Sequence, residues 1–518
     1  MIMKQNPTKT IAWNKLQNHY NEIAPIHLND LFKNQLDRKK QFSINLDDLQ
    51  YNFSNNKITD ATLTLLIELA NEMGLKENIK DFFNGKEINQ TEKRAVLHTA
   101  LRSFSDKGIK VKGEPIYPLI EKTRQQIALF TEQVTSGKWE TYTGKQITDV
   151  VNIGIGGSDL GSKMLVEALD FYRNHLKTHF ISNIDGDALY KTLKEINPET
   201  TLFIIVSKTF TTIETMTNAR SIKKWFLKNA PKSALAKHFV AVSSNKKEAI
   251  NFGVAEANVF PLWDWVGGRF SMWGSVGLSI SLSIGYANFE SFLKGAEKAD
   301  LHFKETPFIN NIPVIMALLS IWHTNFFNTK AEAIVPYAES LNKFSAYLQQ
   351  LFMESNGKSV DKNGIEISYQ TGGVVFGSSG SNAQHSFMQL IHQGTQLIPV
   401  DFIGFRKALY ADQNHHKILM ANFKAQAKAL RQGKTKEAVY LDMKFKGQRK
   451  DINNLLPYKT FKGSKESSSF LFDKLTPNSM GMLVSLYENK VFTQGVIWNI
   501  NSFDQFGVEL GKEMAKDS

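Results

Sequence analysis

Cysteine is absent from this chain of 518 residues. The absence excludes disulfide bonds and thiolate metal sites, and it favours a cytoplasmic protein. A long hydrophobic run is missing as well. The longest candidate for a membrane segment, Val276 to Ala287, is short and interrupted by serine and glycine, so it predicts a buried helix instead. The first residues, Met1 to Thr10, contain no apolar signal-peptide core, which argues against secretion.

Hydrophobic residues make up 42% of the chain and charged residues 22%, as in an ordinary globular protein. The net charge of +12 is concentrated, because residues 424–465 hold 12 lysines and arginines against three acidic residues. Such a segment is more often a solvated face than a nucleic-acid site, and no helix-turn-helix pattern accompanies it. We therefore expect no nucleic-acid partner and no membrane association. Salt-dependent DNA binding stays open as an additional role.

The apolar pattern changes along the chain. Up to about residue 115 it is mostly helical, most clearly over Ile58–Met73 and Glu92–Phe104. From residue 149 onward, short apolar strands alternate with helices such as Ile213–Leu227, which predicts a parallel sheet covered by helices. The predicted strands of this unit are residues 149–155, 178–181, 201–206 and 239–242.

A helical segment, residues 273–303, precedes a second α/β unit. Its predicted strands are residues 333–335, 373–376 and 397–402, and its predicted helices include 341–352 and 415–431. Residues 464–469 predict a loop, and the tail from 480 to 514 returns to helix with a turn at 499–504. The predicted fold class is α/β, with two parallel-rich αβα units and helical extensions at both termini. The predicted limits are 1–115 for the helical N-terminal region, 116–290 for the first domain and 291–518 for the second.

Two loops have the chemistry of a phosphate site. Residues 152–161 and residues 203–212 each run from an apolar strand through glycine or hydroxyl residues into a helix. A helix start offers unpaired N–H groups and the positive end of its dipole to an anion. The dinucleotide fingerprint is not met, because Asp159 stands in place of its third glycine, and Phe352 replaces the first glycine of a Walker A loop. Together, the two loops indicate a binding site for a phosphorylated small molecule that is held by neutral hydrogen-bond donors.

Glu354 is a candidate general base. It follows the predicted helix 341–352, just before Gly357, where a carboxylate can protrude into a cleft. The alternative is a helix-end glutamate that is paired with Lys358.

Three other segments carry candidate groups. His385 follows a run of glycine and serine at a predicted helix start, although a single histidine is usually structural. Arg269 follows two glycines, where it could neutralise an oxyanion. Gln505 and Lys512 are seven residues apart, which predicts two turns along one helix face.

Taken in order, these segments closely resemble the glucose-6-phosphate isomerase (phosphoglucose isomerase) family. The resemblance runs from Thr91 to Lys512, and its most specific motifs are residues 267–271, 353–358 and 504–512. It implies two sugar-isomerase (SIS-type) αβα sandwiches, a homodimer, and no metal or organic cofactor. The implied reaction is the interconversion of glucose 6-phosphate and fructose 6-phosphate through a cis-enediol(ate), in glycolysis and gluconeogenesis.

The resemblance also implies roles for single residues. Glu354 would move a proton between C2 and C1, and Arg269 would stabilise the enediolate. His385 from the neighbouring subunit and Lys512 would assist ring opening, with Glu214 orienting His385. The implied phosphate and sugar contacts are Ser207, Lys208, Thr209 and Thr212, with Gly157 and Ser158 close by, and Gln350 and Gln505.

Three motifs depart from the family pattern. Ala383 replaces a usual glycine and would alter the backbone beside His385 if that position needed a positive φ. Residues 463–467 differ from the usual Gly-Asn-Arg-Pro-Ser, which we expect to change a surface or dimer feature, and Phe506 replaces a usual Trp. A non-catalytic phosphosugar-binding protein is the main alternative. It predicts loss of the base and of the C-terminal lysine, and both are present.

Overall fold

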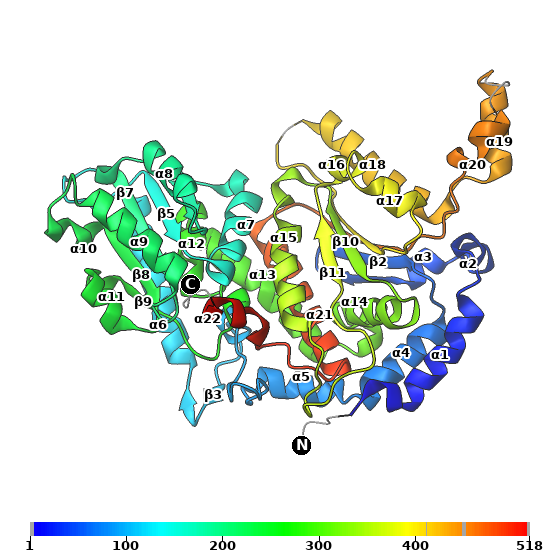
Figure 1. The fold of residues 1–518 in the computed structure, drawn as a ribbon, viewed down its shortest axis with the longest axis horizontal. Helices are drawn as coiled ribbons and strands as arrows, with labels where there is room; N and C mark the ends of the chain where they lie inside the picture. The colour runs from blue at the N-terminus through cyan, green and yellow to red at the C-terminus, as the bar shows by residue number, and fades with distance from the viewer. Residues whose placement is uncertain (1–4, 411, 448–451, 515–518) are drawn as a thin grey trace. The chain divides into compact units, whose positions relative to one another are not determined.

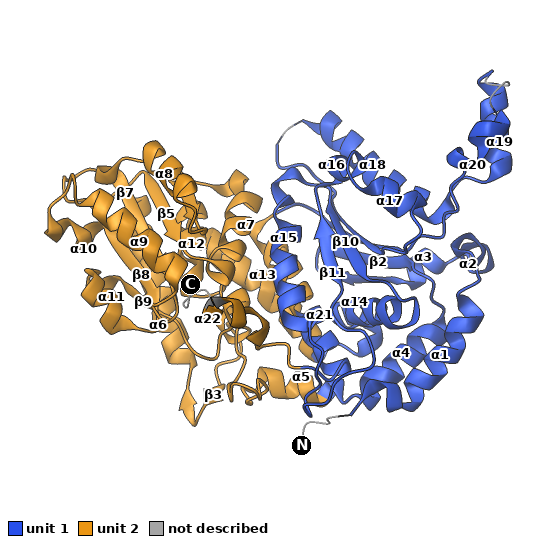
Figure 2. Cartoon of the chain, in the orientation of Figure 1, with its two compact units in different colours: residues 1–76, 305–475, 489–500 blue, residues 77–304, 476–488, 501–518 orange. Residues whose placement is uncertain are grey.

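The computed structural model describes residues 5–410, 412–447 and 452–514. The chain forms two compact units that interleave along the sequence (Figure 2). Unit 1 comprises residues 1–76, 305–475 and 489–500, and unit 2 comprises residues 77–304, 476–488 and 501–518. The chain-order limits at residues 115 and 290 stay a prediction of domain boundaries.

Unit 2 is built on a wholly parallel sheet of five strands in the order β6-β5-β7-β8-β9. The strands are β5 (Asp149–Ile153), β6 (Lys177–Ile181), β7 (Thr201–Val206), β8 (Phe239–Ser243) and β9 (Val259–Pro261). Strands β5, β7 and β8 are buried along their whole length, which explains why they are continuous apolar runs in the sequence. The predicted parallel sheet is confirmed, and β9 adds a strand to it.

Helices cover both faces of this sheet (Figure 1). On one face, Phe203 and Ile205 of β7 pack in a core with Leu189, Ile222 and Ala249, which come from α8, α9 and α11. The helices and small strands of the unit are α5 (Leu75–Phe83), β3 (Lys110–Val111), β4 (Glu114–Pro115), α6 (Tyr117–Thr135), α7 (Leu160–Ala168), α8 (Gly186–Glu195), α9 (Ile213–Phe226), α10 (Leu235–His238), α11 (Lys246–Phe252), α12 (Leu278–Ile284) and α13 (Tyr286–Glu305).

Unit 1 contains a mixed sheet of six strands in the order β1-β2-β13-β12-β10-β11. Its strands are β1 (Ser43–Leu46), β2 (Leu49–Asn55), β10 (Ala331–Pro336), β11 (Val374–Gly377), β12 (Val400–Phe405) and β13 (Ser467–Phe472). The last four are mutually parallel, and β2 runs antiparallel to both β1 and β13. The α/β class with parallel-rich sheets is thus confirmed.

One face of the unit 1 sheet is covered by α16, α17 and α18, and Ala383, Ile391 and Phe423 of these helices pack against Val335 and Phe402 (Figure 1). The helices of the unit are α1 (Ile11–Ile23), α2 (Leu28–Asn34), α3 (Arg38–Gln41), α4 (Asp60–Glu72), α14 (Ile312–Ile321), α15 (Phe344–Gln349), α16 (Gly380–Gln384), α17 (Met388–Gln393), α18 (Gln413–Gln432), α19 (Lys436–Phe445) and α20 (Ile452–Lys459). The tail forms α21 (Pro477–Ile497) and α22 (Leu510–Met514). Among the described residues, none of the helices combines the length and the apolar character needed to cross a membrane.

The structure differs from the prediction in three places. The N-terminal region, which was predicted to be mostly helical, also contains the hairpin β1–β2. Residues 464–469 are not a loop, since β13 begins at Ser467 and pairs with β2 and β12. Residues 92–104 form turns and one 3-10 turn instead of an amphipathic helix. For β13, partners far away in the sequence satisfy the backbone and override the local pattern.

Candidate active site

The two predicted phosphate loops lie at one edge of the unit 2 sheet. Strand β5 pairs with β6 on one side and with β7 on the other, so the chain order reverses between β5 and β7. In open parallel sheets, ligands bind beyond the carboxyl ends of the strands at such a switch point. The loops 154–158 and 207–212 follow β5 and β7 at this edge.

The loop after β7 gathers hydroxyl groups at the start of α9. Ser207 is buried, and its Oγ donates to Thr212 Oγ1 at 3.2 Å. The hydroxyls of Thr209 and Thr211 lie 2.6 Å apart. Phe210 adopts a φ of +58°, which turns the chain tightly between them. The loop therefore presents short neutral donors beside the open end of a helix.

A serine-rich segment after β8 holds this loop in place, and the sequence analysis did not identify it. The hydroxyls of Ser243 and Ser244 donate to the carbonyl oxygen of Lys208 at 3.1 and 2.6 Å. Asn245 Nδ2 donates to the carbonyl oxygen of Thr209 at 3.2 Å. The sequence signal was present, since Ser-Ser-Asn directly follows a predicted strand.

Lys208 is the charged member of the loop. Its Nζ donates to the carbonyl oxygens of Asp264 and Val266 at 3.4 and 3.3 Å. Burial lowers the pKa of Lys208, and the nearby charge of Arg94 lowers it further. Arg94 is thus a second cation close to the loop, and it was not among the predicted site residues.

The glycine-rich loop after β5 packs tightly on the segment that carries Arg269. A Cβ on Gly157 would lie 2.2 Å from the carbonyl oxygen of Gly268 and 2.5 Å from the amide nitrogen of Arg269. Such distances leave room for glycine only. Asn152 Nδ2 donates to the carbonyl oxygen of Ser158 at 3.0 Å and so fixes the end of the loop.

Arg269 is buried and bound to the C-terminal segment. Its guanidinium donates to Gln505 Oε1 at 3.1 Å, to the Ser502 carbonyl oxygen at 2.5 Å and to the Asp504 carbonyl oxygen at 3.3 Å. Two predicted site residues, Arg269 and Gln505, are therefore brought into direct contact.

The prediction that Gln505 and Lys512 share one helix face was wrong. Gln505 precedes a separate 3-10 turn, η15 (Phe506–Val508), and α22 begins after it at Leu510. Lys512 lies in α22. The reason is local, because Gln505 has a φ of −153°, which is outside the helical region.

A buried ion cluster supports the Arg269 segment. Arg102 donates to both oxygens of Asp300, at 2.6 and 2.8 Å, and to Glu488. Trp273 Nε1 donates to the other Glu488 oxygen at 3.0 Å, and the Arg102 guanidinium lies over the Trp273 ring. The His98 ring stacks on Phe270 at 4.5 Å, and burial holds the pKa of His98 well below its usual range.

Glu354 and Gln350 belong to unit 1. They are the last and first residues of a π-helical turn, η13 (Gln350–Glu354), that continues α15. Such turns shift side chains out of helical register and often occur at functional sites. Glu354 is half-buried, and Lys358 Nζ donates to its backbone carbonyl oxygen at 3.4 Å. The buried Gln350 Oε1 has no hydrogen-bond partner within the part of the chain that the structure describes.

His385 is exposed and also belongs to unit 1. The prediction of a helix start there was wrong, since His385 caps the C-terminal end of the short helix α16. Ala383 lies inside α16, is buried, and does not have a positive φ, so this position does not need glycine. Glu214 lies in the first turn of α9 in unit 2.

The segment 463–467 is partly buried, with Ser464 and Lys465 half-exposed, and its effect on a surface or dimer feature stays a prediction. Glu466 is fully buried, accepts from the Lys57 amide at 3.0 Å and lies 2.7 Å from His323 Nε2. Phe506, in contrast, is 53% exposed.

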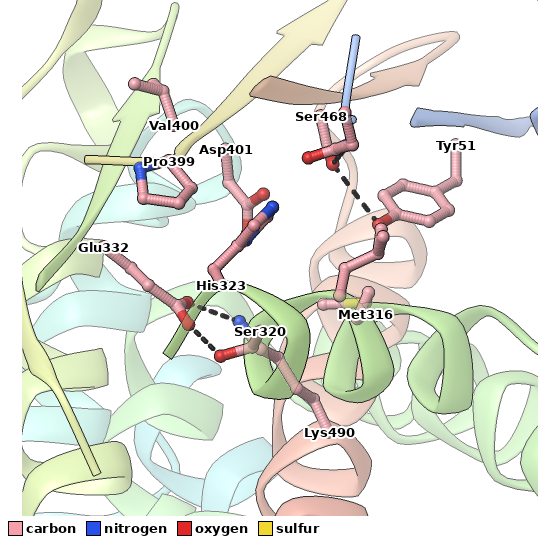
Figure 3. A pocket seen from close by; sticks show the side chains of 12 residues that line it. Tyr51, Met316, Ser320, His323, Glu332, Pro399, Val400, Asp401, Ser468 and Lys490 are labelled. Atoms are coloured by element: carbon pink, nitrogen blue, oxygen red, sulfur yellow. Dashed lines mark hydrogen bonds and ion pairs between the residues drawn. The ribbon is translucent and has the colours of Figure 1, made fainter. Parts of the chain in front are cut away.

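Unit 1 also has an enclosed polar cavity at the amino ends of β10, β12 and β13 (Figure 3). Lys490 Nζ donates to Glu332 Oε2 at 2.6 Å, and Ser320 donates to the other Glu332 oxygen. The volume of about 20 Å³ holds about one water molecule, far less than a sugar phosphate needs. This cavity lies at the amino ends of the parallel strands, opposite the edge where such sheets bind ligands, and we assign it a structural role.

A family model described as phosphoglucose isomerase matches residues 52–518. The chain belongs to this family. Phosphoglucose isomerases interconvert glucose 6-phosphate and fructose 6-phosphate in glycolysis and gluconeogenesis, so the family and the reaction predicted from the motifs are confirmed.

Several phosphoglucose isomerases are similar to this chain over almost its whole length. The glucose-6-phosphate isomerase of Christiangramia forsetii is 54% identical over 98% of this chain and 94% of its own length. That of Buchnera aphidicola subsp. Schizaphis graminum is 52% identical over 99% and 93%. The crystal structure of a glucose-6-phosphate isomerase from Chlamydia trachomatis superposes with a TM-score of 0.87 at 32% identity, over 99% of this chain and 96% of the other.

Proposed function

We propose that this chain interconverts glucose 6-phosphate and fructose 6-phosphate with Glu354 as the base. The observation that carries the proposal is the pair of donor loops at the switch point of the unit 2 sheet, one of which packs directly on Arg269. Ser207, Thr209 and Thr212, with Lys208, hold the phosphate, while Gly157 and Ser158 line its approach. This grip orients the sugar, because the phosphate takes no part in the reaction.

In the proposed chemical step, the Glu354 carboxylate takes the proton from C2 of the open-chain aldose. The electron pair forms the C1–C2 double bond, and the former carbonyl oxygen on C1 becomes the enediolate oxygen. The proton of the C2 hydroxyl then passes to the oxygen on C1, which leaves the negative charge on the C2 oxygen. Glu354 returns its proton to C1 as the C2 carbonyl forms, which gives the ketose. The positive charge of Arg269 stabilises the enediolate, and Gln505 keeps the guanidinium oriented through its Oε1. Gln350, with its unbonded buried Oε1, contacts the sugar or the phosphate.

His385 and Lys512 open the sugar ring in this proposal, with Glu214 orienting His385. His385 comes from a second copy of the chain, so the active site needs a homodimer. Its exposure supports this assignment. The hairpin of α19 and α20, which stands away from the sheet of unit 1 in Figure 1, exposes Leu441, Phe445 and Tyr458 and offers an apolar surface for such a contact. The reaction needs no metal or organic cofactor, and we place it in the cytoplasm.

The test is conversion of fructose 6-phosphate to glucose 6-phosphate by the purified protein in a chelator. We expect turnover in the wild type, a loss of about 10²–10⁴-fold in Glu354→Gln and an unchanged KM, because the amide keeps the shape but cannot accept a proton. Glu366→Gln, at an exposed glutamate of the same unit, is the matched control. Substantial turnover in Glu354→Gln would remove Glu354 as the base. No turnover in a folded wild-type dimer would favour a phosphosugar sensor.

A mixing experiment tests the shared site. Glu354→Gln and His385→Ala dimers are each inactive. After reassortment, about a quarter of wild-type activity should return, since half of the dimers are mixed and each has one intact site. No recovery would mean that both groups act within one chain.

A further inference from the structure

Unit 2 has a hollow between α9 and α11, which we call the α9–α11 pocket. Its volume is about 600 Å³, within the range of roughly 300–1,000 Å³ that small-molecule sites occupy. Its apolar part is formed by Phe210, Met216 and Phe252. The predicted phosphate site does not use this hollow, although Phe210 belongs to the loop after β7.

The pocket is lined by four cations, Arg220, Lys223 and Lys224 of α9 and Lys228 just after it. Glu248 is the only acidic residue among the described residues that line it. Arg220 and Lys224 are four residues apart on α9, which brings two like charges together on one helix face and disfavours the helix, and Lys228 follows just beyond the end of the helix. An anion in the pocket would remove this repulsion.

The cations have few protein partners. Throughout the described ranges, no ion pair joins Arg220, Lys224 or Lys228 to a carboxylate. Lys223 is held differently, because its Nζ donates to the Phe252 carbonyl oxygen and lies 4.4 Å from the centre of the Phe252 ring. Glu248 accepts from Asn251 Nδ2 of its own helix, α11, at 3.2 Å. Positive charge in a concave, partly apolar site concentrates anions.

We propose that the α9–α11 pocket binds a compact anion with two or more negative charges, a small molecule of the diphosphate or bisphosphate class. The site differs in kind from the loop after β7, whose donors are mostly neutral hydroxyls. Binding in the pocket rests on ammonium and guanidinium charges and therefore weakens steeply with salt. Phe210 joins the two sites physically, since its ring lines the pocket and its amide donates to the Ser207 carbonyl oxygen at 3.2 Å.

Calorimetric titration of the full chain with inorganic pyrophosphate tests this inference, and it requires no turnover. Arg220→Glu combined with Lys224→Glu should weaken binding at least tenfold, and Arg220→Gln with Lys224→Gln should weaken it less. Lys417→Glu, an exposed lysine of α18, is the control for a change in net charge and should bind as the wild type does.

The double variant Ser207→Ala, Thr209→Ala separates the pocket from the loop after β7, and it should keep the pocket's binding. The inference is overturned if the wild type binds no pyrophosphate, if both α9 variants bind like the wild type, or if the loop variant alone loses binding. Because this assay reports binding only, its failure would leave the proposed isomerase function untouched.

Discussion

The two units carry different kinds of functional group. Unit 2 supplies donors and a fixed positive charge: hydroxyls after β7, a glycine loop after β5, and Arg269. Unit 1 supplies the ionisable groups Glu354 and His385, on a π-helical turn and at the end of a five-residue helix. In the proposed mechanism, grip on the phosphate and movement of the proton are therefore assigned to separate units. Variants in the two units should have separable effects.

The units also differ in how their buried charges are held. Arg102 in unit 2 bonds to two carboxylates, whereas Lys490 in unit 1 is paired with Glu332. Arg102→Met should destabilise the protein by about 3–5 kcal/mol, because it leaves Asp300 and Glu488 buried without their cation. Lys490→Met should destabilise the protein less, because it removes the cation from one buried carboxylate, that of Glu332, instead of two. Chemical denaturation measures both, and Lys294→Met, at an exposed pair with Glu290, should change stability by less than about 0.5 kcal/mol. Equal losses in the two units would contradict the comparison.

The charge of Arg269 is expected to matter mainly in the transition state. Arg269→Lys keeps the charge but cannot contact Gln505, Ser502 and Asp504 at once, so the cation is poorly placed. We expect kcat to fall about 10²–10³-fold. Steady-state kinetics with fructose 6-phosphate measures this. A change confined to KM would mean that Arg269 binds substrate and does not stabilise the enediolate.

The donors of the loop after β7 should affect binding alone. Ser207→Ala combined with Thr209→Ala removes two hydroxyl donors of about 0.5–1.5 kcal/mol each, so KM should rise about tenfold with kcat nearly unchanged. Glu354→Gln in unit 1 should lower turnover, whereas this variant in unit 2 should raise KM, so the two variants distinguish the roles proposed for the two units. An unchanged KM would place the phosphate in another loop.

The smallest effect concerns Asp159, next to the glycine loop. Burial raises its pKa to about 6 from a usual 3.8. Below about pH 3 this carboxyl is protonated in the folded and the unfolded state, so its burial costs little. As the pH rises from about 3 to about 6, the unfolded state loses the proton first and native stability falls. Asp159→Asn should therefore gain about 1 kcal/mol at pH 7.5 and almost nothing at about pH 3. Thermal unfolding at the two pH values measures the difference, and an equal gain at both would exclude this cause.

Sequence reasoning worked best where short-range sequence patterns determine the secondary structure. The strands β5 and β7 and the start of α9 were predictable, because each is an apolar run or a helical pattern with its own start signal. The same holds for the hydroxyls of Ser207 and Thr212, which lie directly between the two elements. The family motifs then added Glu354 and His385, whose roles no spacing rule could give.

What the sequence could not give depends on distant partners. Strand β13 was missed because a run of serines is typical of a loop. Only its pairing with β2 and β12 makes this segment a strand. Arg94 was missed because its place near Lys208 follows from the irregular segment around it. Gln505 was misplaced on a helix, although the correct contact is with Arg269.

The pairing of β2 with β13 has a consequence for biosynthesis. Tyr51 faces Phe470, so the N-terminal hairpin gains its neighbouring strand only after more than 400 further residues have been made. At translation rates of about 5–20 residues per second, this delay is roughly 20 to 80 s. During that time the open edge of β2 has no native neighbour and can pair with other nascent chains.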